Sequence, residues 1–111
     1  MVIDILVMAD LMQHDWASQL KNDHDAIVLD VRTQEEVDEG KIPNALHIDI
    51  YRGQGFIDDL ELLDKDKTYY VYCKAGARSA QACAIMGQLG FKEAHNLLGG
   101  FSQWTGEVEN I

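Results

Sequence analysis

The chain has 111 residues, of which 47% are hydrophobic and one is proline, and this composition favours a single globular domain over residues 1–111 and excludes a disordered chain. The formal net charge of −10 argues against nucleic acid and anionic membranes as partners, because both repel an acidic surface. Two cysteines make neither a disulfide framework nor a common zinc motif, and no apolar stretch reaches the length of a signal sequence or a membrane span. We therefore expect a reducing, cytoplasmic location.

The first third of the chain alternates predicted strands and helices. Residues 3–7 are expected to form a short strand, and residues 9–20 a helix, because apolar residues recur there at helical spacing. Trp16 lies among these apolar residues and is expected in the core. A polar connector then leads to the unbroken apolar run 26–29, which is typical of a parallel strand covered on both faces.

Two charged residues, Asp30 and Arg32, follow at the end of that strand. The favoured interpretation is that they lock the turn through hydrogen bonds or an ion pair, and a supporting role at a site on the same sheet edge stays open. Thr33 and Glu36 stand at the spacing of a helix capping box. A short helix is therefore expected to begin at Thr33 and to stop near Gly40.

The remaining elements continue the same alternation. Strands are expected at residues 46–48, 68–72 and 94–98, helices at 56–63 and 79–89, and a final helix after the turn at residues 99–100. Residues 52–55 are expected to be flexible, and the helix over 79–89 to be buried on most sides. Alternating strands and helices predict a three-layer α/β fold with a mainly parallel sheet.

The candidate site lies in the loop between the predicted strand 68–72 and the helix 79–89. Cys73 ends the strand, and the residues that follow it are Lys74, Ala75, Gly76, Ala77, Arg78 and Ser79. Ligands of open α/β sheets bind beyond the carboxyl ends of the strands, against helix N-termini. We expect six consecutive backbone N–H groups to curl around the cysteine sulfur, with Arg78 closing the ring.

Such a ring of donors favours an anion and lowers the pKa of a thiol. A fall of about two units from the usual ~8.5 makes the thiolate the majority form at neutral pH. The alternative is that Cys73 is a small buried hydrophobic residue, as free cysteines often are. Four basic residues and no acidic residue lie between Lys67 and Lys92, which indicates a local positive window for an anion. A buried strand and helix that exclude charge would give the same pattern by chance.

Four segments stand in the order and spacing of the rhodanese domain. They are LDVRT at 29–33, GKIPNA at 40–45, CKAGARS at 73–79 and LGGFSQW at 98–104. The chain therefore resembles a stand-alone single-domain rhodanese from about residue 3 to residue 104. It departs from the family at Lys41, Asn44 and Val37, where a histidine, a glycine and an aromatic residue are common. These departures concern one turn and one packing position.

The resemblance implies a five-stranded, mainly parallel sheet with helices on both faces and sulfurtransferase chemistry through a cysteine persulfide. Carried over to this chain, Cys73 is the nucleophile that accepts sulfur, and the amides of residues 74–79 form the cradle. Arg78 orders the loop and stabilises the anion, and Lys74 helps to bind the donor. The implied partners are a small anionic donor such as thiosulfate and a thiol or cyanide acceptor, with a protein donor or acceptor left open. No cofactor is implied.

Three alternatives stay open beside this function. A cysteine phosphatase is disfavoured because four residues separate Cys73 and Arg78, whereas such phosphatases are known for five and thus for a wider cradle. A sulfur carrier would take persulfide sulfur from a protein and use thiosulfate poorly. A non-catalytic regulatory domain would bind without chemistry.

The second cysteine and the histidines are expected to be structural. Cys83 lies within the predicted helix, roughly 7 Å along the axis from its start, so a buried thiol is favoured over a resolving thiol. The four histidines show no spacing typical of metal ligands, and no metal site is expected.

Overall fold

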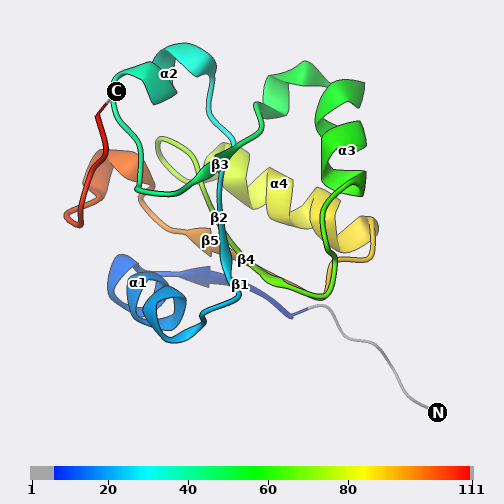
Figure 1. Ribbon diagram of the computed structural model, residues 1–111, viewed down its shortest axis with the longest axis horizontal. Helices are drawn as coiled ribbons and strands as arrows, with labels where there is room; N and C mark the ends of the chain where they lie inside the picture. Colours follow the sequence, from blue (N-terminus) through cyan, green and yellow to red (C-terminus); the bar gives the residue numbers. More distant parts are fainter. Residues whose placement is uncertain (1–6, 111) are drawn as a thin grey trace.

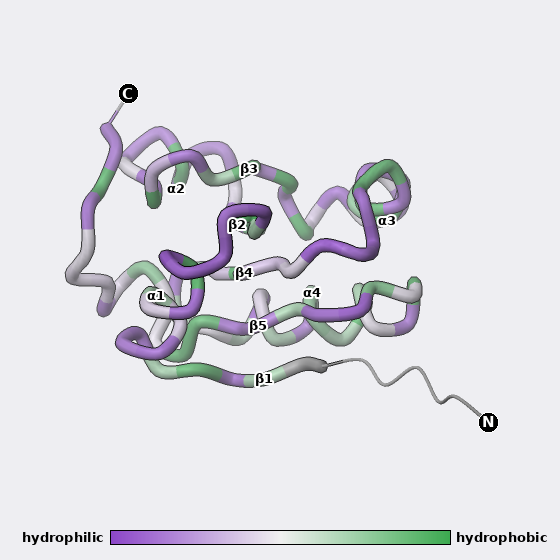
Figure 2. Tube along the Cα trace, turned by 60° about the horizontal axis from the view of Figure 1, so that its bottom comes forward, coloured by the Kyte–Doolittle hydropathy of each residue, from purple (hydrophilic) through white to green (hydrophobic). Residues whose placement is uncertain are grey.

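The computed structural model describes residues 7–110 and contains a five-stranded sheet whose paired strands run parallel. The strands are β1 (Val7–Leu11), β2 (Ile27–Asp30), β3 (Leu46–His47), β4 (Thr68–Tyr72) and β5 (Glu93–Leu97). The helices are α1 (Gln13–Asn22), α2 (Gln34–Asp38), α3 (Gln54–Glu61) and α4 (Ala77–Gln88), with 3₁₀ turns η1 (Ile50–Arg52) and η2 (Phe101–Gln103). The strand order is β1-β5-β4-β2-β3, as Figure 2 shows from bottom to top. The predicted α/β class with a parallel sheet is confirmed.

The alternation of side chains along β4 explains why helices cover both faces of the sheet. Tyr69 and Val71 point to one face, where they pack in a core cluster with residues of α3 and α4. Tyr70 and Tyr72 point to the other face, where they pack with Trp16 of α1. Figure 1 shows α1 on one side of the strands and α3 with α4 on the other. Trp16 is fully buried, so its predicted place in the core is confirmed.

The beginning of the chain differs from the prediction. The strand expected at residues 3–7 lies outside the described residues except for Val7, which begins β1. The helix expected from residue 9 begins instead at Gln13, because Ala9 to Leu11 pair with β5 in parallel register. Apolar residues at this spacing fit both a strand and a helix, and the pairing with β5 decides between them.

Residues 52–55, expected as a flexible segment, have regular helical structure on both sides of Gly53. Arg52 ends η1 and Gln54 begins α3. The Asp49 side chain caps η1 by accepting a hydrogen bond from the N–H of Tyr51. The α3 helix therefore begins two residues before its predicted start.

The helix that follows the candidate loop also differs in extent and burial. It begins at Ala77 rather than residue 79, because Gly76 serves as its N-cap. Only one face is buried, and Ala80 and Ala84 on the other face are exposed. Alanine has the highest helix propensity of all residues and needs no burial to favour a helix, which is why its abundance predicted a more buried helix than the structure has.

Two turns have backbone conformations that need a physical explanation. Asn44, at the position where the resembled family commonly has glycine, adopts a φ of 65°, a left-handed conformation that asparagine tolerates better than most residues. The expected final helix is only the 3₁₀ turn η2, because Trp104 is extended. The segment after it returns beside α2, where Lys41 and Glu109 form an isolated antiparallel bridge (Figure 1).

Among residues 7–110, no helix is long and apolar enough to cross a membrane.

Candidate functional site

The Cys73 loop turns sharply between the end of β4 and the start of α4. Gly76 has a φ of 108°, which side chains with a Cβ rarely adopt, so glycine is required here. Cys73 is almost fully buried. The other loop residues divide into three groups: Gly76 and Ser79 are buried, Arg78 is partly buried, and Lys74, Ala75 and Ala77 are exposed.

Hydrogen-bond donors from the loop and from α4 surround the Cys73 sulfur. The Gly76 N–H donates to Sγ at 3.1 Å, and the Ser79 hydroxyl lies 3.3 Å from Sγ. Burial by itself raises the pKa of the Cys73 thiol, but hydrogen bonds from the Ser79 hydroxyl and from the N–H groups of Ser79, Gly76 and Ala75 outweigh it. The net result is a pKa below the ordinary value. Of the six predicted amides, that of Gly76 forms a hydrogen bond to the sulfur, and those of Ala75 and Ser79 contribute to its lowered pKa.

The segment after β5, formed by the Gly99-Gly100 turn and η2, holds the backbone of the Cys73 loop in place. The N–H of Phe101 donates to the Cys73 carbonyl oxygen at 2.8 Å, and the N–H of Ser102 donates to the Lys74 carbonyl oxygen at 2.9 Å. Gly100 allows this approach, since a Cβ there would lie 2.5 Å from the carbonyl carbon and oxygen of Lys74. The glycine pair predicted as a turn therefore also supports the candidate site.

Arg78 is directed at α2 rather than closing a ring around the sulfur. Its guanidinium forms two hydrogen bonds to the Glu36 carboxylate, at 2.7 and 2.9 Å, and lies over the Tyr51 ring. The hydrogen bond from Arg78 lowers the pKa of Glu36 to about 2. The pKa of Arg78 is raised, chiefly by Glu36, and the Cys73 charge contributes as well. Arg78 therefore acts on the sulfur as a nearby fixed positive charge.

The structure confirms that Asp30 and Arg32 form a buried ion pair that locks the turn after β2. The nitrogen atoms of the Arg32 guanidinium donate to both Asp30 carboxylate oxygens at 2.8–3.1 Å, and its NH2 group also reaches the Gly40 carbonyl oxygen. The Tyr72 hydroxyl donates to Asp30 at 2.6 Å. Since Tyr72 immediately precedes Cys73, the pair supports the end of β4. Within residues 7–110, neither Asp30 nor Arg32 forms a hydrogen bond to the Cys73 sulfur.

Two residues with direct contacts to the loop were not predicted as part of the site. Glu36 was recognised only as a capping residue, and the structure has it both closing the capping box with Thr33 and binding Arg78. Asn96 of β5 contacts Ser79 and the Gly76 carbonyl oxygen. The available signal for Asn96 was a polar residue in the middle of the strand predicted at residues 94–98.

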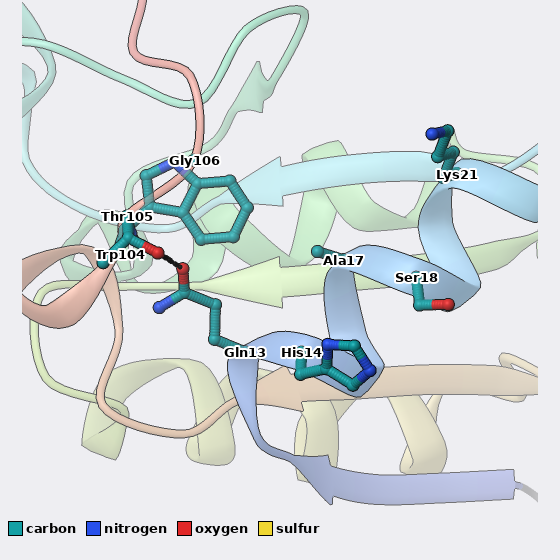
Figure 3. A pocket seen from close by; sticks show the side chains of 8 residues that line it. All are labelled: Gln13, His14, Ala17, Ser18, Lys21, Trp104, Thr105 and Gly106. Carbon is teal, nitrogen blue, oxygen red and sulfur yellow. Dashed lines mark hydrogen bonds between the residues drawn. The ribbon is translucent and has the colours of Figure 1, made fainter.

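Two hollows lie near this edge of the fold. A cavity of about 190 Å³ adjoins the loop and is lined by Lys74, Ser102, Phe101, Arg32, Glu36 and Glu39. A larger open groove of about 610 Å³ lies between α1 and the C-terminal segment. Figure 3 shows Gln13 and Thr105 hydrogen-bonded at one end of this groove and Lys21 at the other. None of the residues lining the groove belongs to the Cys73 loop.

The other cysteine is far less suited to reaction. Cys83 is buried within α4, and burial raises the pKa of its thiol to about 12. Both cysteines are free thiols. Within residues 7–110, no group of three or more histidine, cysteine or acidic residues is placed to hold a metal ion.

Comparison with known proteins agrees with this geometry. The model of the rhodanese-like domain family matches residues 13–107. The chain is 40% identical over 91 residues to a Bacillus subtilis protein named "Putative sulfurtransferase YtwF", covering 82% of this chain and 84% of that protein. It is 35% identical over 98 residues to "Thiosulfate sulfurtransferase GlpE" of Coxiella burnetii, covering 88% and 89% of the two chains.

A solved structure extends the match to the whole fold. The crystal structure of a rhodanese-like domain protein from Staphylococcus aureus superposes with a TM-score of 0.79 at 29% identity. The alignment covers 95% of this chain and 99% of that chain. The chain therefore belongs to the rhodanese-like domain family.

Proposed function

We propose that the protein is a sulfurtransferase that carries sulfane sulfur on Cys73 as a persulfide. The donor is thiosulfate or another persulfide, and the acceptor is cyanide or a thiol. The observation that carries this proposal is the Cys73 sulfur itself, which is buried beneath the Gly76 N–H and the Ser79 hydroxyl and has a lowered pKa. The relatives named as sulfurtransferases support sulfur transfer as the general activity.

The first half of the reaction forms the persulfide. The Cys73 thiolate attacks the outer sulfur of thiosulfate, a new S–S bond forms, and the donor S–S bond breaks. Sulfite leaves with the electron pair of that bond. The N–H groups of Ala75, Gly76 and Ser79 stabilise negative charge at the sulfur, as an oxyanion hole does for oxygen. Lys74, exposed at the mouth of the loop, supplies a positive charge for the anionic donor.

The second half returns the thiolate. The acceptor attacks the outer sulfur of the persulfide, and the persulfide S–S bond breaks with its electron pair remaining on Cys73. Cyanide yields thiocyanate, and a thiolate yields a new persulfide. Donor and acceptor react in separate halves, so ping-pong kinetics are expected. The two halves balance without a cofactor, because no net oxidation occurs.

Thiocyanate formation from thiosulfate and cyanide tests this function. Wild-type protein and a Cys83→Ser variant should give parallel double-reciprocal lines, and Cys73→Ser should be inactive. Activity that persists in Cys73→Ser would contradict the proposal. Cys83→Ser is the matched control, because it removes the other thiol without touching the loop.

The alternatives predict different results in the same preparations. A sulfur carrier would show little thiocyanate formation but would accept sulfur from a persulfidated protein at Cys73. A phosphatase would hydrolyse an aryl phosphate and lose that activity in Cys73→Ser. A regulatory domain would show none of these reactions. We also propose a reducing, cytoplasmic location, which suits two free thiols.

A further inference from the structure

The buried Asn96 amide has a fixed orientation beside the candidate site. Its side chain is about 2% exposed. Nδ2 donates to Asp10 Oδ1 at 3.0 Å and to the Gly76 carbonyl oxygen at 3.2 Å. A carbonyl oxygen accepts hydrogen bonds only, and an ionised carboxylate does the same, so the NH₂ group must face them. The amide oxygen, Oδ1, must therefore face Ser79.

Only one proton is available for two acceptors at Ser79. The Ser79 hydroxyl donates a hydrogen bond to Asn96 Oδ1, and it also lies 3.3 Å from the Cys73 sulfur. The Gly76 carbonyl oxygen, also 3.3 Å from the hydroxyl, already accepts from Asn96 and from the Ala80 N–H. A hydroxyl has a single proton, so the real competition is between Asn96 Oδ1 and the sulfur.

We propose that Asn96, held by Asp10, is a positioning residue that draws the Ser79 proton away from the Cys73 sulfur and so limits the stability of the free thiolate. This inference rests on Cys73 being the sulfur-accepting thiol of the proposed function. Asn96 does not contact the sulfur and acts through Ser79.

The three states of the cysteine differ in how they satisfy this chain of hydrogen bonds. In the neutral state the thiol S–H donates to Ser79 Oγ, whose proton goes to Asn96, and every group is satisfied. When the thiolate forms, the Ser79 proton turns to sulfur and leaves Asn96 Oδ1 buried without its donor, which is costly. In the persulfide the charge lies on the outer sulfur, and the Ser79 proton returns to Asn96. The hydrogen bonds among Cys73, Ser79 and Asn96 thus disfavour the sulfur-free thiolate relative to the persulfide.

Other charged and titratable groups around the sulfur must be separated from this effect. Arg78 and Cys83, both of α4, interact electrostatically with Cys73. Glu36 of α2 neutralises part of the Arg78 charge, Lys74 lies next to Cys73 in the loop, and Asp10 of β1 adds a negative charge behind Asn96. These charges act whether or not residue 79 carries a hydroxyl, whereas the proposed effect of Asn96 requires it.

A double-mutant cycle read by the pH dependence of Cys73 alkylation tests the proposal. The rate of reaction with iodoacetamide gives the thiol pKa and requires no sulfur donor, so it remains readable if sulfur transfer itself fails. Asn96→Leu, which removes the acceptor but keeps the volume, should lower the Cys73 pKa by about one unit. In the Ser79→Ala background, the same substitution should have no effect on the pKa.

Several outcomes would overturn the proposal. One is a Cys73 pKa that is unchanged or raised in Asn96→Leu. Another is an equal shift of the Cys73 pKa with Ser79 and with Ala at position 79, which indicates a merely structural or electrostatic effect. If Asn96→Leu does not fold, Asp10→Ala replaces it, because Asp10 is the exposed residue at the end of the series of hydrogen bonds from Ser79 through Asn96. Loss of the Asp10 charge lowers the Cys73 pKa by the same amount in both backgrounds. The proposal requires a further fall in the Cys73 pKa that occurs only when Ser79 is present. Absence of that additional shift would also contradict it.

Discussion

The ion pair between Glu36 and Arg78 offers the sharpest test of how α2 holds the candidate loop. The perturbation is Glu36→Gln, which removes the charge but keeps an amide oxygen able to accept the hydrogen bonds from the Thr33 N–H and hydroxyl. The two partners are partly buried, with side chains 24% and 19% exposed. The variant therefore isolates the charge of Glu36 from its capping role.

The magnitude follows from the pKa of Glu36. A fall from 4.5 to about 2 corresponds to roughly 3 kcal/mol in favour of the charged form. Because both side chains are partly exposed, solvent screening reduces this, and a loss of about 1–2 kcal/mol at pH 7 is expected. The pKa is depressed in the folded state, so the stabilisation is complete above about pH 4.5 and is lost as the pH falls toward 2.

Urea denaturation of wild type and variant across this pH range measures the difference in free energy of unfolding. The difference should be constant near neutral pH and shrink toward zero as Glu36 becomes protonated in the wild type. Glu35→Gln is the matched control, because Glu35 is exposed in the same first turn, and it should cost only about 0.3–0.5 kcal/mol. A difference that does not depend on pH, or a control that loses as much, would refute the reasoning.

Three further predictions concern the supports of the loop and its thiols. Asp30→Asn leaves Arg32 buried without its counterion and should lower the free energy of unfolding, measured with urea, by about 3–5 kcal/mol. Asp59→Asn breaks an exposed pair with Arg52 and should lower it by less than about 1 kcal/mol. Equal losses in the two variants would contradict the burial of the Asp30–Arg32 pair. Gly100→Ala should lower the melting temperature more than Gly53→Ala does. Both glycines have a φ near 60°, but of the two only Gly100 faces backbone atoms within 4 Å, those of Cys73 and Lys74. Equal melting temperatures of the two variants would contradict the close approach of Gly100 to the Cys73 loop. Iodoacetamide should modify Cys73 with a pH midpoint below the free-cysteine value of ~8.5 and leave Cys83 unmodified. Peptide mapping that finds Cys83 labelled first would contradict the identification of Cys73 as the reactive thiol.

The location of the Cys73 loop could be predicted because local signals there agree. An apolar strand, small residues and a helix-forming segment fix the cysteine at the carboxyl end of β4, and the structure has it there. The capping box at Thr33 and Glu36 was likewise a local pattern and is confirmed. Short-range hydrogen bonds and backbone preferences determine such features, so the sequence alone suffices for them.

Long-range partners could not be predicted in the same way. The bond of Arg78 to Glu36 joins residues 42 positions apart, and that of Asn96 to Asp10 joins residues 86 positions apart. Whether residues 9–11 form a strand or a helix also depends on a partner, because β1 exists through its pairing with β5. Such choices are made by tertiary packing, which local propensity does not encode.

The persulfide on Cys73 is the central claim, and mass spectrometry of the intact protein tests it most directly. After incubation with thiosulfate, the wild type and Cys83→Ser should gain the mass of one sulfur atom, cyanide should remove it, and Cys73→Ser should gain nothing. An adduct formed only with a persulfidated protein would assign the carrier role to Cys73. An adduct in Cys73→Ser, or none in the wild type with any sulfur donor, would contradict the account.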